Sequence, residues 1–177
     1  MFGRMRVGYP VRMSAPARTF SPHDLAALAA EGMLITLAAG HAGSPPALAT
    51  ALALRLGDQP AEVTVLLPRS GAWQLLADLA GGAAWAVSLS HPRTHRAIQL
   101  KGRRAEEILP AATDVALVAR QRENLRLMLA AAGFDDAMLA TLCAFDPDDL
   151  TAIALTLDTA YDQTPGAQTG QALERAA

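Results

Sequence analysis

The residues best suited to chemistry lie in one stretch, residues 91–103, which holds the only lysine, Lys101, among 15 basic side chains. In an extended strand successive side chains point to opposite faces, so Ile98 and Leu100 share one face while Gln99 and Lys101 share the other. An amide and an ammonium group side by side can bind a ligand that offers both hydrogen-bonding groups and negative charge. The stretch therefore predicts a binding strand with one largely apolar and one polar, basic face.

A second candidate site lies at Arg69 and Ser70, where a strand is expected to end and a helix to begin. Ser70 is a typical N-cap residue, and the amides at positions 70–72 would then point out of the helix end. Phosphates commonly bind at such an end, with Arg or Lys supplying the opposite charge. Arg69 and Lys101 are the candidate cations, and the alternative is an ordinary helix cap with solvated basic side chains.

Other reactive residue types do not form a recognisable motif. His41, His91 and His95 lack the paired spacing of zinc ligands, so we predict no metal site and keep haem ligation only as an alternative. Cys143, the single cysteine, lies in an apolar segment, which predicts a buried thiol in a reducing compartment. Neither a Ser-His-Asp order nor a phosphate-binding glycine loop is present, and the catalytic residues stay unknown.

Composition limits the partners. A chain of 177 residues is the size of one domain, and its net charge of −2 gives no overall field that would attract nucleic acid or an anionic membrane. The most apolar run, residues 25–40, is interrupted by Glu31 and is shorter than the ~20 residues needed to span a bilayer. We therefore expect a soluble, cytoplasmic protein with a small-molecule substrate, and neither nucleic acid nor membrane as a partner.

The pattern of apolar residues, turns and caps predicts a mainly β fold with peripheral helices (α+β). Six strands are expected, at residues 33–39, 47–56, 62–67, 83–89, 95–103 and 150–157, with helices at 21–30, 70–80, 110–132 and 135–142. Turns separate most neighbouring strands, which favours a closed or partly closed antiparallel barrel over a parallel sheet.

One domain is expected. We predict a loose N-terminal arm at residues 1–19, a single domain at 20–170 that includes a helical insertion at 110–142, and a tail at 171–177.

Three segments carry a resemblance to a known family. Residues 65–70 (VLLPRS), 94–102 (THRAIQLKG) and 162–166 (DQTPG) resemble, in order and spacing, the pyridoxamine 5'-phosphate oxidase-like, FMN-binding split-barrel proteins. The resemblance covers about residues 25–170. It implies a six-stranded antiparallel Greek-key split β-barrel that forms a homodimer with FMN at the dimer interface. It also implies a flavin-dependent oxidoreductase acting on a small substrate.

The resemblance also implies positions for the cofactor. Thr50 stands where the oxidases have an arginine on the flavin phosphate, and Arg55 matches a lysine that binds the substrate phosphate. Ser70 and its neighbour replace an Arg-Lys pair, which argues against a true pyridoxamine phosphate oxidase. The implied cofactor-binding residues are Thr50, Leu52, Arg55, Val65, Leu66, Arg69, Ser70, Gln99 and Lys101.

These departures leave a second class of function open. The same dimeric fold can serve as a non-catalytic or regulatory module that binds a flavin, a deazaflavin or haem, or that carries no ligand as isolated. Whether the protein is an enzyme is therefore left open by the sequence.

Overall fold

The computed structural model describes residues 19–57 and 61–175, so the predicted N-terminal arm lies, except for its last residue, outside the described part. Four helices are present in that part: α1 (Pro22–Ala30), α2 (Trp73–Ala80), α3 (Asp114–Ala131) and α4 (Asp136–Cys143). The strands are β1 (Thr19–Phe20), β2 (Leu34–Gly40), β3 (Ala47–Ala51), β4 (Ala53–Leu56), β5 (Glu62–Pro68), β6 (Ala84–Ser90), β7 (Ala97–Gly102), β8 (Arg104–Ile108), β9 (Leu150–Thr156), β10 (Thr159–Asp162) and β11 (Gln171–Arg175).

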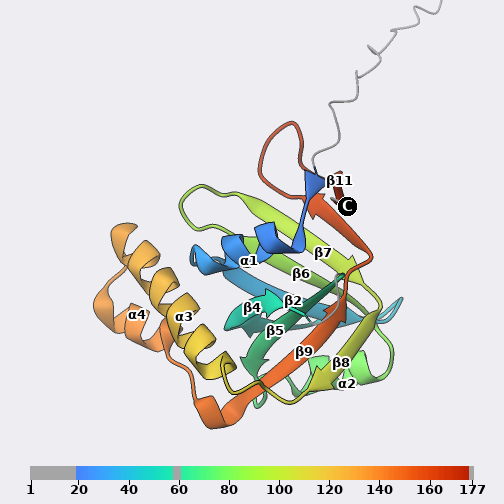
Figure 1. Ribbon diagram of the computed structural model, residues 1–177, viewed down its shortest axis with the longest axis horizontal. Helices are drawn as coiled ribbons and strands as arrows, with labels where there is room; N and C mark the ends of the chain where they lie inside the picture. Colours follow the sequence, from blue (N-terminus) through green and yellow to red (C-terminus); the bar gives the residue numbers. More distant parts are fainter. Residues whose placement is uncertain (1–18, 58–60, 176–177) are drawn as a thin grey trace, which may run out of the picture.

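The strands form two sheets. The large sheet has the order β1-β11-β10-β7-β6-β2-β3, and the small sheet has the order β4-β5-β9-β8. All pairs are antiparallel except β1 with β11. Figure 1 shows α3 and α4 together on one side of the two sheets, and α2 near the end of β8.

Three long strands pass from one sheet to the other, and each is divided into two of the eleven strands of the described part; β1 and β11 are additional to the six predicted strands. β3 continues into β4 after Leu52, β7 into β8 after Arg103, and β9 into β10 after residues 157–158. With each pair taken as one strand, the pairing runs β2, β3/β4, β5, β9/β10, β7/β8, β6 and back to β2. Neither sheet closes on itself, because the circuit is completed only by the three strands that pass between the sheets. The predicted mainly β, six-stranded antiparallel split barrel is confirmed.

Burial shows which sheet faces are covered. β5 is buried along its whole central part, because the main core lies on one face and a smaller cluster with Val118 of α3 lies on the other. β2 and β6 instead alternate between buried and partly exposed residues. Such alternation is typical of a sheet that is packed on one face only. One face of the large sheet therefore lies outside the core.

The predicted start of α1 is correct, whereas the predicted start of α2 is not. Ser21 caps α1 as predicted: its hydroxyl accepts from the Asp24 N–H at 3.2 Å, and its own N–H donates to Asp24 at 2.8 Å. The hydrogen bond from the Ser21 backbone lowers the pKa of Asp24. In contrast, α2 begins at Trp73, after Ala72, so the predicted cap at Ser70 is wrong.

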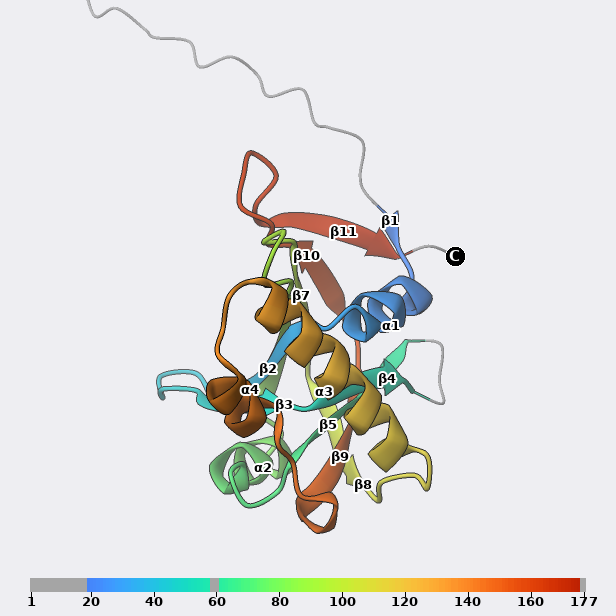
Figure 2. The same ribbon diagram turned by 90° about the vertical axis from the view of Figure 1, so that its left-hand side faces the viewer.

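Two further boundaries differ from the prediction. α3 begins at Asp114 instead of residue 110, because the Asp114 carboxylate accepts from the Ala111 N–H at 2.8 Å and ends the preceding turn. Residues 171–175, expected as a tail, form β11, which pairs with β10 on one side and β1 on the other. Figure 2 shows these strands at the end of the molecule away from α2. No helix in the described part is long and apolar enough to cross a membrane.

Candidate functional site

A row of polar side chains crosses five neighbouring strands on the uncovered face of the large sheet. Strand register places Thr50 opposite Thr36, Thr36 opposite Ser88, Ser88 opposite Gln99, and Gln99 opposite Tyr161. Residues directly opposite each other in an antiparallel pair point to the same face. All five are partly or fully exposed, so the row is open to a ligand.

A second row lies beside the first and contains Lys101. Its members, again paired strand by strand, are Leu48, Ala38, Ala86, Lys101 and Thr159. We call the ten residues of the two rows the outer face. Lys101 is exposed and is the only charged residue of the outer face. The outer face is therefore a nearly uncharged surface with one cation on it.

Two of the three segments that carry the family resemblance, residues 94–102 and 162–166, meet at the edge of the outer face. The Gln163 N–H donates to the Ala97 carbonyl at 2.8 Å, and the Ala97 N–H donates to the Thr164 hydroxyl at 3.1 Å. The Gln163 side-chain amide donates to Gln99 Oε1 at 3.4 Å. The turn that follows β10 thus holds the start of β7 and contacts the side chain of Gln99.

Arg69 and Ser70 lie elsewhere and have carboxylate partners. Arg69 forms an ion pair with Glu107, and Ser70 donates to Asp149 through its N–H at 2.9 Å and its hydroxyl at 2.5 Å. A phosphate placed here would meet two negatively charged groups and would lose the donors of Ser70. Arg69 and Ser70, as the structure shows them, are therefore poorly suited to a phosphate.

Arg55 is held by α3. Its Nε lies 2.9 Å from the carboxylate of Asp114, which is fully buried, and its Nη1 donates to the Leu56 carbonyl at 3.1 Å. The guanidinium group therefore joins β4 to the start of α3, and its charge is already balanced.

The three apolar candidates are core residues. Leu52, Val65 and Leu66 are at most 7% exposed, and the Leu52 N–H donates to the Leu66 carbonyl at 2.7 Å. Their side chains pack inside the fold and support the two sheets. Of the predicted site residues, Thr50, Gln99 and Lys101 share the outer face.

Sequence reasoning missed Thr36, Ser88 and Tyr161 as parts of the outer face. The alternation of small polar residues with buried ones in β2 and β6 was the available signal for Thr36 and Ser88. Tyr161 immediately precedes the DQTPG segment, and its ring centroid lies 4.9 Å from Lys101 Nζ.

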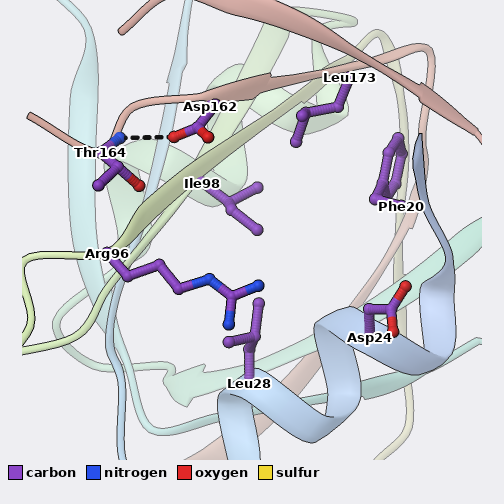
Figure 3. Close-up of a pocket in the computed structure, with 8 residues that line it drawn as sticks. All are labelled: Phe20, Asp24, Leu28, Arg96, Ile98, Asp162, Thr164 and Leu173. Atoms are coloured by element: carbon purple, nitrogen blue, oxygen red, sulfur yellow. Dashed lines mark hydrogen bonds between the residues drawn. The ribbon is translucent and has the colours of Figure 1, made fainter. Parts of the chain in front are cut away.

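A small cavity lies between α1 and the start of β7. Its volume is about 60 Å³, and its polar lining includes Asp24, Arg96 and Asp162. Figure 3 shows the Arg96 side chain reaching toward Leu28 of α1, while Asp162 accepts from the Thr164 N–H at 2.8 Å. A space of this size cannot hold a nucleotide, since ligand pockets are typically several hundred Å³.

The histidines show no arrangement for a metal. His91 Nδ1 accepts from the N–H groups of Arg93 and Thr94 at 3.2 and 3.1 Å, so this nitrogen has a structural role in the loop. Across residues 19–57 and 61–175, no group of three His, Cys, Asp or Glu side chains is placed to hold a metal ion.

Comparison with known proteins gives structural matches only, since no family model and no curated protein matches the chain. The fold is similar to that of a putative pyridoxamine 5'-phosphate oxidase from Lactobacillus delbrueckii, with 13% identity, a TM-score of 0.47, and coverage of 84% of this chain and 97% of that one. It is also similar to HupZ of Group A Streptococcus, with 14% identity, a TM-score of 0.49, and coverage of 84% and 98%.

A third similar structure is a protein related to general stress protein 26, of the pyridoxinephosphate oxidase family, from Clostridium acetobutylicum. It shows 10% identity, a TM-score of 0.48, and coverage of 86% of this chain and 93% of that one. Oxidase-like proteins are thus among the structural matches, as the sequence resemblance predicts.

Proposed function

We propose that this protein is a homodimeric FMN-binding oxidoreductase that acts on a small substrate and binds its flavin against the outer face. The observation that carries the proposal is the pairing of Gln99 and Lys101 on a face that is otherwise uncharged. A flavin nucleotide offers a planar ring with a polar edge and a negatively charged phosphate, which match a flat neutral surface, an amide and a cation.

The side chains of the outer face fit such a ligand. The Gln99 amide can both donate to and accept from the polar edge of the flavin ring. Lys101 forms no ion pair with any described residue, so its charge is available to a ligand. Thr50 and Tyr161 lie in the same row as Gln99 and extend the polar contact surface.

A second copy of the chain is part of the proposal. Leu48 is 61% exposed and Leu34 is 37% exposed, and both project from the uncovered side of the large sheet beside small uncharged residues. Homodimer interfaces are richer in apolar area and poorer in charge than ordinary surface. The partner would cover the flavin and supply phosphate contacts that this chain lacks at Arg69 and Ser70.

The bound flavin would supply the redox chemistry. The residues of this chain would bind and orient it, and the charge of Lys101 would act near the ring or the phosphate. A true pyridoxamine phosphate oxidase is not proposed. We expect the protein to act in the cytoplasm, where its single cysteine stays reduced.

A second candidate function is a non-catalytic or regulatory module that binds a flavin, a deazaflavin or haem on the same face. The pairing of Arg69 with Glu107 and of Ser70 with Asp149 favours it, because a phosphate group has fewer free cations to bind. On this alternative the same outer face takes a ligand but no turnover follows.

Titration of the purified protein with FMN tests the proposal. Flavin fluorescence should change in a saturable way, with one flavin per chain, and light scattering should show a dimer. Parallel titrations with a deazaflavin and with haem show whether the outer face prefers another ligand, and reduction or oxidation of the bound flavin by added substrates separates a catalyst from a binding module. Failure of FMN to bind at tens of micromolar, or a monomer at the same concentration, would overturn the proposal.

A further inference from the structure

A pocket between α3 and α4 lies away from the outer face and shares no residue with it. Its volume is about 260 Å³. The lining is mainly apolar, with Leu139, Phe145 and Cys143, and its charged residues are Arg122, Glu123 and Arg126. Figure 1 shows α3 and α4 running side by side at the edge of the fold. The flavin proposal assigns no role to this pocket.

Arg122 is a buried cation on the α3 wall of the pocket. It is only 5% exposed, and its Nη2 donates to the Leu142 carbonyl at the end of α4. Its Nε is buried without a hydrogen-bond partner. Burial lowers the pKa of Arg122, and the nearby Cys143 acts in the opposite direction. A guanidinium group nevertheless stays charged in proteins.

No carboxylate balances this charge in the described part of the chain. The neighbouring Glu123 already forms an ion pair with Arg126. The Nε and Nη2 atoms of Arg126 lie 2.7 and 2.8 Å from the two carboxylate oxygens of Glu123. The Leu142 carbonyl carries only a partial charge, so it satisfies one N–H group without neutralising the cation. A buried charge without a counter-ion is unfavourable, because the lost hydration is not replaced. An anion in the pocket would remove that cost.

We propose that the α3–α4 pocket binds a small organic carboxylate with a short apolar chain. Arginine binds carboxylates through paired N–H groups, and such charge-assisted hydrogen bonds are stronger than neutral ones. The carboxylate pairs with Arg122, while the apolar chain packs against Leu139 and Phe145. The proposal does not depend on the bound flavin and is tested without it.

Cys143 provides a local reporter, because it is the only cysteine of the chain and it lines the same pocket. The full-length protein is treated with iodoacetamide, and the single alkylation is followed by intact mass. Sodium hexanoate should slow the reaction in a saturable way. The slowing should reach about tenfold at about ten times the hexanoate Kd, since the free fraction falls as 1/(1 + [L]/Kd). 1-Hexanol, which lacks the charge, should give little protection at the same concentrations.

Variants test the role of the cation. Arg122→Met should abolish protection by hexanoate, whereas Arg120→Met, which removes an exposed arginine of the same helix, should leave it unchanged. If Arg122→Met does not fold, Arg122→Lys keeps a charge without the planar group and should show weaker protection. Equal protection by hexanoate and hexanol in the wild-type protein would overturn the proposal. No protection by hexanoate, or full protection in Arg122→Met, would do the same.

Discussion

The ammonium group of Lys101 lies 4.9 Å from the centroid of the Tyr161 ring, on the adjacent strand of the large sheet. A cation at this distance is attracted by the electrons of the ring face. The contact holds the one charge of the outer face near the row that contains Gln99 and Tyr161. The lysine is thus held in position by a neutral group and keeps its full positive charge for a ligand.

Loss of this charge should weaken FMN binding. Lys101→Met removes a charge-assisted contact and should raise the Kd for FMN by about 10- to 100-fold, equivalent to about 1–3 kcal/mol. Arg104→Met removes an exposed arginine from β8 and is the matched control. Fluorescence titration of both variants gives the comparison, and equal affinities for FMN would show that Lys101 does not contact the flavin.

The proposed dimer should depend on the outer face. Leu48→Asp places a charge in a row that has no other acid, so light scattering should show a shift from dimer to monomer at micromolar concentration. Leu127, 53% exposed on α3, offers a control of similar exposure against the 61% of Leu48. Leu127→Asp should remain dimeric. A dimer that survives Leu48→Asp unchanged would place the interface on another surface.

Gly32, between α1 and β2, should tolerate no side chain. Its φ is +90°, and an added Cβ would lie 2.8 Å from the carbonyl carbon of Asn124 in α3. Gly133 has a similar φ of +92° but open space around it. Thermal or urea unfolding should therefore show a loss of about 1–2 kcal/mol for Gly133→Ala, from backbone strain alone. Gly32→Ala should lose more, and equal losses would contradict the close helix contact.

The ion pair between Arg55 and Asp114 should contribute to stability. Asp114 is fully buried and Arg55 is 23% exposed, so Asp114→Ala leaves a partly buried cation without its partner and should lower the free energy of unfolding by about 3 kcal/mol. Glu123→Ala breaks the exposed pair with Arg126 and should change stability little. Urea unfolding of the two variants measures both effects, and similar values would contradict a buried pair.

The fold was largely predictable because its signals are local. The apolar pattern of β5 and the turn at residues 40–46 depend on neighbouring residues, and the six strands were found. The bend at Leu52 was not, because β3 and β4 share one apolar run that predicts a single strand. β8 was missed because it lies beyond the predicted strand end at residue 103 and its sequence, RAEEI, is mostly polar. β11 was missed because its pairing partners supply its stability while its own sequence is polar.

The site was predictable only in part. Alternation along β7 correctly put Gln99 and Lys101 on one face, since side-chain direction follows from the strand itself. The partners of Arg69 and Ser70 are 38 and 79 residues away in the sequence, at Glu107 and Asp149. No local pattern indicates such contacts. The sequence therefore could not show that Arg69 and Ser70 have carboxylate partners or that Ser70 does not cap a helix.

The position of the flavin is the central claim, and a crystal structure of the protein grown with FMN tests it most directly. The account predicts density for the flavin against the outer face, with its ring or phosphate within hydrogen-bonding distance of Gln99 and Lys101 and a second chain covering it. Flavin density beside Arg69 and Ser70, or anywhere away from the outer face, would contradict the account.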